Sequence, residues 1–449
     1  MKKLLVIAYG FPPMSYAGVF RTLRFCKYLP QLDWQPLVLT IKENPYHNKD
    51  YSLMDQLPKN VKIYRTSTID PAKWYSNRPQ ARRSMIGNGG QEHTNDSLIK
   101  NLFQKSSVIK KIKRSLFNFV TFPDHVIFWV PFALITGIRI LVKEKPDIIY
   151  TSSPPHSSHL IGLILSKLFR KPWVADFRDP WVDSDYLNQL LQTNIQIKMT
   201  IWLEALIVKN ATRVLLNTEF NRNVMLQRYH SLDQKKIRTL MNGFDYDDVR
   251  DVVPQDNKKF TITFMGTFYS CFKTDLFLDG LKLWVKETGL SNVLNRFQVL
   301  FVGGKNSEVE KMIQERELSN IVRCVGYMPK KEAMGICLAS HLLLLILGFN
   351  KGSTGIVPSK LFDYFLCKKP ILAIAPEGEI AQLVKESKAG HVISGDDPRL
   401  IAQVIDNKYK EFIKKGEVDY SPDRSVIERY SAQFLGKRLA AIFDEIRKN

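Results

Sequence analysis

Short apolar runs alternate with stretches of helical periodicity along nearly the whole chain. This alternation is typical of βαβ units, which build a mostly parallel sheet covered by helices. A first series of strands is predicted at 4–8, 36–40, 61–65, 147–151, 173–177 and 213–216. A second series is predicted at 261–264, 298–302, 342–347 and 371–374. We therefore expect an α/β chain with two doubly wound, Rossmann-like domains.

The two series are separated by a polar, acidic stretch that contains Pro254, which is typical of a linker. We place an N-terminal domain at 1–250 and a second domain at 258–420. The remaining segment, 421–449, carries apolar residues near the helical period, so we expect a final helix over roughly 425–447. This helix is expected to return to the N-terminal domain. A chain of 449 residues is long enough for two hydrophobic cores.

The cysteines and the first residues both favour a cytoplasmic protein. The five cysteines are scattered and show no spacing typical of a zinc site or a disulfide framework. Residues 1–8 begin like a secretory signal, but the apolar run ends at Tyr9 without a small-residue cleavage site. We therefore interpret this run as a buried first strand.

The formal net charge of +21 predicts an anionic partner, such as nucleic acid, phospholipid headgroups or phosphorylated substrates. The sequence contains no zinc-finger spacing and no aromatic-studded basic motif of the RNA-recognition type. We therefore expect no nucleic-acid partner.

Two neighbouring segments differ in character, and the second of them points to a membrane surface. Residues 70–97 are rich in Asn, Gly, Arg and Ser and read as a mobile insertion, whereas 99–118 carries six cations and no acid among apolar residues. Such a segment suits a helix in an anionic membrane interface, and the alternative is a solvated basic face. The cations expected to contact the membrane are Lys110, Lys111, Lys113 and Arg114.

The next segment, 126–138, is strongly apolar but contains only 13 residues before Arg139. A membrane-spanning helix needs about 20 residues. The segment is therefore expected either to form a buried helix before the strand at 147 or to contact a membrane.

The turn after the first strand runs from Tyr9 to Arg21, contains Gly18 and opens a helix. A glycine here allows close approach of a ligand, and the helix N-terminus offers free N–H groups to an anion. A plain strand-to-helix turn has the same appearance.

Several motifs occur in an order that resembles family 4 glycosyltransferases of the GT-B fold, especially those of capsule, O-antigen and exopolysaccharide assembly. The matching motifs are Phe11-Pro-Pro…Gly18…Arg21, Pro146-Asp-Ile-Ile-Tyr-Thr-Ser-Ser-Pro-Pro-His-Ser-Ser-His159, Lys171-Pro-Trp-Val-Ala-Asp-Phe-Arg-Asp-Pro-Trp181, Asn242-Gly-Phe-Asp245, Phe264-Met-Gly-Thr267, Val357-Pro-Ser-Lys-Leu-Phe-Asp-Tyr-Phe365 and Lys369-Pro-Ile-Leu-Ala373. The resemblance covers nearly the whole chain.

This resemblance implies two facing domains and transfer of a hexose-type sugar, with retention, from a nucleoside diphosphate sugar. The implied acceptor is a lipid-linked sugar or an oligosaccharide, at the inner face of the plasma membrane. The sequence shows no Asp-x-Asp motif and no two-histidine-plus-acid spacing, so we expect no metal and no cofactor. Two alternatives stay open: a sugar-nucleotide epimerase of the same fold, and an inactive membrane-bound scaffold that binds a sugar nucleotide.

A metal-free transferase needs fixed cations and N–H dipoles aimed at the leaving diphosphate. Lys360 and Ser359 begin a predicted helix after the glycine-rich segment 352–355, an arrangement that favours an anion. The resemblance adds Gly266 and Lys273 to the residues expected to bind the donor. Lys273 stands at the position where the family carries a lysine that binds the donor phosphate; the alternative is an exposed lysine at a helix start.

Resemblance also assigns Asp363 to the second acid of the family's paired-glutamate motif, which accepts hydrogen bonds from ribose hydroxyls. The chain departs from the family at two positions: Gly355 replaces the first acid, and Thr267 replaces an arginine. Binding of the diphosphate then depends more on Lys273, Lys360 and Arg21.

In the first domain, Arg178 and Asp179 follow a predicted strand, at the edge where doubly wound sheets bind ligands. Arg178 stays protonated and can bind phosphate, whereas Asp179 can receive the proton of the acceptor hydroxyl. An internal ion pair between the two is the alternative. His156, beside His159, follows another strand end and is expected either to contact a substrate or to cap a helix.

Overall fold

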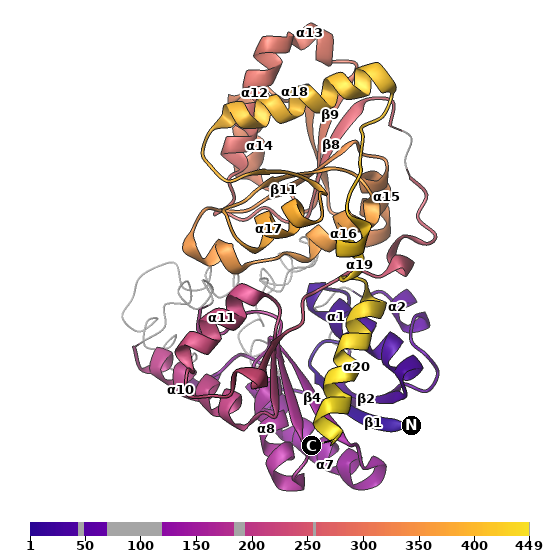
Figure 1. Ribbon diagram of the computed structural model, residues 1–449, viewed down its shortest axis with the longest axis vertical. Coiled ribbons are helices and arrows are strands. Elements are labelled where there is room, and N and C mark those ends of the chain that lie inside the picture. Colours follow the sequence, from indigo (N-terminus) through magenta and orange to yellow (C-terminus); the bar gives the residue numbers. More distant parts are fainter. Residues whose placement is uncertain (44–48, 70–118, 184–193, 255–256, 449) are drawn as a thin grey trace, which may run out of the picture. The chain divides into compact units, whose positions relative to one another are not determined.

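The computed structural model describes residues 1–43, 49–69, 119–183, 194–254 and 257–448 (Figure 1). The predictions for the insertion 70–97 and for Lys110, Lys111, Lys113 and Arg114 in 99–118 lie outside these residues. The chain forms two compact units: Met1–Met241 with Ala432–Asn449 is unit 1, and Asn242–Ser431 is unit 2. The chain therefore passes between the units twice.

Unit 1 contains a seven-stranded sheet in the order β3-β2-β1-β4-β5-β6-β7, in which every neighbouring pair is parallel. Its strands are β1 (Lys2–Ala8), β2 (Trp34–Ile41), β3 (Lys62–Thr66), β4 (Ile148–Ser153), β5 (Trp173–Phe177), β6 (Arg213–Leu216) and β7 (Ile237–Thr239). The direction of the series reverses between β1 and β4, and β4 and β5 are buried over their whole length. Such a reversal opens a crevice at the carboxyl ends of these strands.

Helices cover both faces of this sheet. On one face lie α7 (Val130–Glu144), α8 (Ser157–Phe169), α10 (Asn194–Asn210) and α11 (Glu219–Arg228), which share a core around Trp129 and Trp173. On the other face, α1 (Ala17–Tyr28) packs against α20 (Ala432–Lys448) over a core around Trp34 and Phe443. Short elements complete the unit: η1 (Leu29–Leu32), α2 (Ser52–Asp55), η2 (Ile127–Trp129) and η3 (Gln234–Lys236).

Unit 2 contains a six-stranded parallel sheet in the order β10-β9-β8-β11-β12-β13. Its strands are β8 (Phe260–Met265), β9 (Phe297–Val302), β10 (Val322–Gly326), β11 (Leu342–Ile346), β12 (Ile371–Ile374) and β13 (Gly390–Ile393). Its helical elements are η4 (Tyr246–Val249), α12 (Thr274–Thr288), α13 (Leu290–Val293), α14 (Ser307–Glu315), α15 (Lys330–Leu338), η5 (Lys351–Gly355), α16 (Ser359–Cys367), α17 (Glu379–Glu386), α18 (Pro398–Lys415) and α19 (Arg424–Glu428). The main core packs α12 and α18 against the sheet.

All ten strands predicted from the sequence are present. The three strands that the sequence analysis missed are β7, β10 and β13, and each lies at an edge of its sheet. The predicted final helix is divided into α19 and α20. Between them, the backbone leaves the helical path and the N–H of Phe244 donates to the Tyr430 carbonyl oxygen at 3.0 Å, so the two crossings between the units run side by side.

None of the described helices is long and apolar enough to cross a membrane.

Candidate active site

In unit 1, two of the predicted site residues meet where α1 begins. A Cβ atom placed on Gly18 would lie 2.0 Å from Nη1 of Arg178, so only glycine allows the guanidinium to lie over the first turn of α1. Arg178 donates from Nε to the Ser153 carbonyl oxygen at 3.1 Å and from Nη2 to the Pro154 carbonyl oxygen. Nη1 has no hydrogen-bond partner among the described residues. A fixed cation therefore stands beside the free N–H groups of a helix N-terminus, which favours an anion.

Asp179 follows Arg178, and the two residues form no ion pair with each other. The Asp179 side chain is exposed, yet the surrounding protein raises the pKa of its carboxyl group by desolvation, against the opposing effect of the Arg178 and Arg21 cations. A raised pKa makes this carboxylate a better proton acceptor.

Arg21 forms a buried ion pair that was not predicted from the sequence. Its Nε and Nη2 atoms each donate to a carboxylate oxygen of Asp176 at 2.8 Å, and Tyr150 donates to the same carboxylate. Further hydrogen bonds run from Arg21 to the carbonyl oxygens of Leu240 and Met241. Arg21 is buried and Asp176 is fully buried, so this guanidinium joins three segments of unit 1 instead of projecting toward a donor phosphate.

His156 lies at the N-cap position of α8, but its side chain makes no capping hydrogen bond. Its ring stacks on that of Trp181, with the centroids 4.2 Å apart. Burial, followed by the charges of His159 and Arg178, lowers its pKa well below the ordinary value. His156 is therefore neutral at pH 7 and offers a hydrogen bond and no charge.

His159 is fully buried, and burial lowers its pKa to about 3. Its Nδ1 lies 2.7 Å from Oγ1 of Thr151, which accepts a hydrogen bond from Nε1 of Trp173. The Thr151 hydroxyl then donates to His159, because among the described residues its only other acceptor is a carbonyl oxygen at 3.5 Å. This assignment places the proton of His159 on Nε2.

Several buried polar atoms between the end of β4 and the start of α8 have no hydrogen-bond partner among the described residues. They are the hydroxyl oxygens of Ser152, Ser153 and Ser158, Nδ1 of His156 and Nε2 of His159. Buried polar atoms normally find a partner, so such a group marks a place for a polar ligand or ordered water. These serines were not predicted as site residues. The signal for them was a pair of Ser-Ser dipeptides on either side of Pro-Pro-His156 at the end of a strand.

In unit 2, Gly266 and Lys360 come together at the carboxyl end of β8. Gly266 has a φ of 128°, and a Cβ atom there would lie 2.8 Å from Nζ of Lys360. The ammonium group lies 4.0 Å from the ring centroid of Phe264 and has no hydrogen-bond partner among the described residues. Burial lowers its pKa to about 7, although Asp363 acts in the opposite direction.

Lys360 is also the second residue of α16, whose first turn contains no acidic residue. Ser359, the first residue, is exposed, and Gly355 ends the short helix η5 just before it. The structure thus combines a buried cation with free N–H groups of a nine-residue helix. This is the chemistry that binds phosphate.

Lys273 stands at the N-cap position of α12, and its Nζ lies 2.9 Å from Oδ1 of Asp396. Both side chains are partly or fully exposed, so the ion pair is weak and open to exchange for a ligand. Thr267 is half-buried after Gly266, on the segment that leads to Lys273.

Asp363 is buried and makes an ion pair with Lys330, a residue that the sequence analysis missed. Nζ of Lys330 lies 3.0 Å from Oδ1 of Asp363 and 3.0 Å from Oδ2 of Asp248. No hydrogen bond to Oδ2 of Asp363 is present among the described residues, so this oxygen can accept one from a ligand. Lys330 lies 33 positions before Asp363 in the sequence, and no local pattern connects the two.

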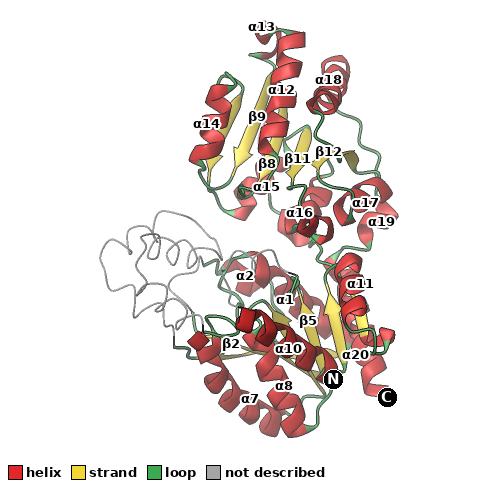
Figure 2. Cartoon of the chain, turned by 90° about the vertical axis from the view of Figure 1, so that its left-hand side faces the viewer, coloured by secondary structure: helices red, strands yellow, loops and turns green. Residues whose placement is uncertain are grey.

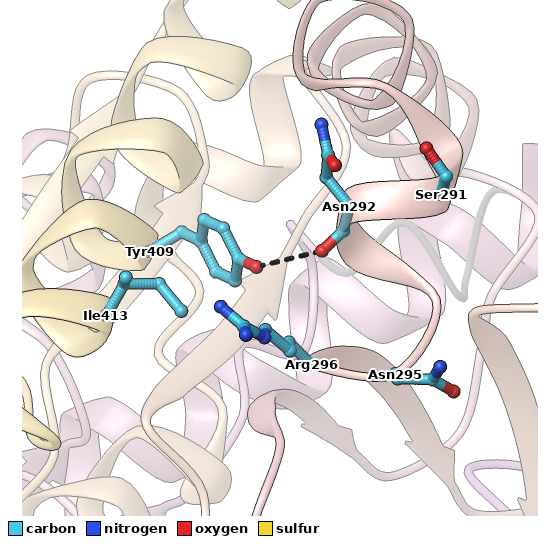
Figure 3. Close-up of a pocket in the computed structure, with 6 residues that line it drawn as sticks. All are labelled: Ser291, Asn292, Asn295, Arg296, Tyr409 and Ile413. Atoms are coloured by element: carbon cyan, nitrogen blue, oxygen red, sulfur yellow. Dashed lines mark hydrogen bonds between the residues drawn. The ribbon is translucent and has the colours of Figure 1, made fainter.

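A cavity of about 440 Å³ lies elsewhere in unit 2 (Figure 3). It is lined by Ser291, Asn292, Asn295, Arg296, Tyr409 and Ile413. Arg296 immediately precedes β9, so the cavity lies at the amino edge of the sheet, whereas the predicted site residues follow the strands at the carboxyl edge. None of the predicted site residues lines it.

Among the described residues, no three His, Cys, Asp or Glu side chains are grouped closely enough to hold a metal ion.

Comparison with known proteins identifies the fold. No family model and no curated protein matches the sequence. The structure is similar to HepE of Anabaena, solved with UDP and glucose, at a TM-score of 0.60 and 13% identity over 99% of this chain and 100% of that chain. It is also similar to sucrose-phosphate synthase from Thermosynechococcus elongatus, at a TM-score of 0.62 and 13% identity over 99% of both chains.

A glycosyltransferase from Rickettsia africae matches at a TM-score of 0.58 and 16% identity, over 100% of this chain and 99% of that chain. These alignments span both units. The chain therefore has the GT-B fold, with two Rossmann-like α/β units, and the prediction of fold class is confirmed.

Proposed function

We propose that this protein is a glycosyltransferase that takes its sugar from a nucleoside diphosphate sugar. The observation that carries the proposal is Lys360, whose buried ammonium group lies beside Gly266 and has no hydrogen-bond partner among the described residues. A buried charge without a counter-ion is costly, and a bound diphosphate supplies one. The similar structures include a glycosyltransferase from Rickettsia africae and HepE in complex with UDP and glucose, which supports this choice.

On the donor side, Lys360, Ser359 and the N–H groups of α16 bind the diphosphate, with Gly266 and Thr267 allowing close approach. Lys273 exchanges its exposed partner Asp396 for the diphosphate as negative charge grows on the leaving group. The free oxygen of Asp363 accepts a ribose hydroxyl, while Lys330 fixes the orientation of the carboxylate. Gly355 leaves room near the sugar where relatives carry an acid.

On the acceptor side, Nη1 of Arg178 binds a phosphate or orients the acceptor, and Gly18 makes space for it. The acceptor hydroxyl forms a bond to the anomeric carbon on the same face from which the diphosphate departs, the bond to the diphosphate breaks, and Asp179 receives the hydroxyl proton. Neutral His156 and the serine hydroxyls at the start of α8 form hydrogen bonds with hydroxyl groups of the acceptor. We propose transfer of a hexose with retention, without a metal or cofactor.

The acceptor is a lipid-linked sugar or an oligosaccharide of surface polysaccharide assembly. The enzyme acts at the inner face of the plasma membrane, and the basic segment 99–118 contributes to its attachment. The net charge of +21 supports an anionic partner of this kind.

The test is a panel of sugar nucleotides, UDP-sugars first, screened against the full chain by thermal shift. Sugar nucleotides that stabilise the protein are then assayed for release of the nucleoside diphosphate with and without added acceptors. Lys360→Met should remove the thermal shift, and Lys286→Met, an exposed lysine of α12, is the matched control.

Acceptor-dependent release by the normal chain confirms the proposal. Conversion of the sugar nucleotide without any acceptor would identify an epimerase. Tight binding without turnover would identify the inactive scaffold, which the glycine at position 355 makes worth testing.

A further inference from the structure

Three helices of unit 1 present large apolar side chains to solvent. α7, α8 and α10 lie side by side over the same face of the sheet, so their outward surfaces form one layer (Figures 1 and 2). Nine large apolar residues on this layer are between 36% and 67% exposed: Ile135, Ile138, Val142, Ile164, Leu168, Ile195, Ile197, Ile201 and Trp202. On the opposite face of the sheet, α1 and α20 together expose one such residue, Phe434.

The spacing of these residues shows that they form stripes. On α7, Ile135, Ile138 and Val142 recur at the helical period on the side away from the core residues Gly137 and Leu141. On α8, Ile164 and Leu168 lie one turn apart. On α10, four of the seven exposed residues are apolar, and Trp202 is 64% exposed.

The charges on the same helices have one sign. The exposed charged residues are Arg139, Lys143, Lys167, Lys198 and Lys209. None of these five forms an ion pair within the described part of the chain. The two acids of these helices, Glu144 and Glu204, are buried and bind cations of unit 1 that lie outside the layer, namely Lys3, Lys62 and Arg228.

We propose that the outer layer of α7, α8 and α10 is a docking surface for an anionic phospholipid membrane. Aliphatic side chains and a tryptophan enter the headgroup boundary, while long basic side chains reach the phosphates beside them. A protein partner is a poorer match, because protein interfaces are depleted of lysine where this layer is rich in it. This inference rests on the surface alone and not on the reaction proposed above.

The test measures binding of the full chain to phosphatidylcholine vesicles with and without phosphatidylglycerol, over a range of salt concentrations. Binding should require phosphatidylglycerol and weaken as salt rises. Two triple variants test the surface: Ile135→Ser, Val142→Ser and Trp202→Ser in the first, and Arg139→Gln, Lys143→Gln and Lys198→Gln in the second.

The basic variant should bind such vesicles about 100-fold more weakly at low salt, since each of its three cations near a charged surface is worth roughly fivefold in affinity. The apolar variant should bind about tenfold more weakly or worse, since it loses side chains that would enter the headgroup boundary. Circular dichroism and thermal unfolding verify that the variants are folded. The matched control for the basic variant removes three exposed lysines of unit 2: Lys286→Gln, Lys331→Gln and Lys414→Gln. The control for the apolar variant is Val253→Ser with Tyr327→Ser, two exposed apolar residues of unit 2.

Trp202 supplies a direct readout. Brominated lipids quench a tryptophan that enters the headgroup region, and this quenching should disappear in Trp202→Phe. Trp34, Trp129, Trp173, Trp181 and Trp284 are fully buried and serve as the internal background, and Trp74, which lies outside the described residues, is replaced by Phe in both proteins.

Three outcomes would overturn the proposal. Unchanged vesicle binding in both triple variants would place the contact elsewhere. Loss of binding only when Lys110, Lys111, Lys113 and Arg114 are replaced by glutamine would assign it to 99–118. A change of oligomeric state in the apolar variant, with no vesicle binding by the normal chain, would make the layer an interface between two copies.

Discussion

Lys360 is the residue whose protonation can report ligand binding. Its pKa of about 7 means that it is half deprotonated near neutral pH when nothing anionic is bound. A diphosphate beside the ammonium group favours its charged form and raises this pKa. Binding must therefore take up protons above pH 7.

We predict that the affinity for UDP falls as the pH rises from about 7 to 9, by up to about tenfold per pH unit. Calorimetric titration at several pH values measures this. Lys360→Arg should bind with little pH dependence, because arginine keeps its charge, and Lys360→Met should bind weakly at every pH. An affinity of the normal chain that is constant over this range would remove Lys360 from the phosphate site.

Lys273 is expected to act mainly on the rate. We predict that Lys273→Ala lowers turnover about 100-fold or more without changing the fold, because a lost charge-stabilising donor costs a few kcal/mol in the transition state. Asp396→Asn removes only its exposed partner and should leave turnover within a few-fold of normal. A near-normal rate for Lys273→Ala in single-turnover assays would exclude the assigned role.

Asp363→Ala should mainly weaken donor binding, since a ribose contact is similar in the ground and transition states. The control is Asp248→Ala, which takes the other carboxylate from Lys330 and leaves Asp363 in place. Donor affinity measured by calorimetry should fall more for Asp363→Ala than for Asp248→Ala. Equal effects would mean that Asp363 only holds Lys330.

The Arg21–Asp176 pair predicts a large effect on stability. Asp176→Ala removes the carboxylate that pairs with a buried guanidinium, which should reduce the free energy of unfolding by roughly 3–5 kcal/mol. Glu377→Ala, which breaks an exposed ion pair with Lys385, should cost no more than about 1 kcal/mol. Urea unfolding followed by circular dichroism distinguishes the two, and equal midpoints would show that the buried pair is not a stabilising link.

The candidate site could be read from the sequence only where a residue follows a recognisable strand or begins a recognisable helix. Gly266 and Arg178 directly follow β8 and β5, and Lys360 is the second residue of α16. Lys330 and Asp248 could not be found, because their link to Asp363 is made by packing between distant segments. The burial of Arg21 against Asp176 likewise depends on strand order, which a single sequence does not contain.

At the level of elements, the central strands were predictable because they are buried on both faces. β4, β5 and β11 are buried at every position, and apart from Asp176 and Tyr150 their residues are apolar or small. The missed edge strands are different: β10 alternates between buried and exposed residues, and β13 contains an exposed histidine. An edge strand packs on fewer neighbours, so its sequence is less constrained.

The helix α20 completes one hydrophobic core of unit 1, so its removal should strongly destabilise that unit. Leu435, Leu439, Phe443 and Ile446 are buried against Phe25, Trp34 and Tyr150. We predict that a chain ending at residue 431 loses the cooperative unfolding of unit 1 and binds the dye ANS. Removing 447–449 alone, after the last buried residue of the helix, is the control and should change little. A fully folded, soluble chain ending at 431 would contradict the assignment of α20 to this core.

At the level of the whole molecule, the two-domain GT-B fold followed from two series of strands separated by a linker. The sequence analysis placed the boundary at a polar stretch after residue 250, whereas the units divide between Met241 and Asn242. The reason is that 242–254 is held by unit 2: Asp248 binds Lys330, and Phe244 pairs with the segment at Ser431. A polar composition marks where a chain is exposed, not which core its side chains join.

The double passage of the chain makes unit 2 an insertion within unit 1. On the ribosome, unit 2 has all of its residues before residues 432–449 are made, so it can finish folding while the sheet of unit 1 still waits for its last helix. During that interval the surface around Trp34 and Phe25 stays uncovered in the nascent chain. This surface is the natural place for a chaperone to hold the protein, and release can follow only after synthesis is complete.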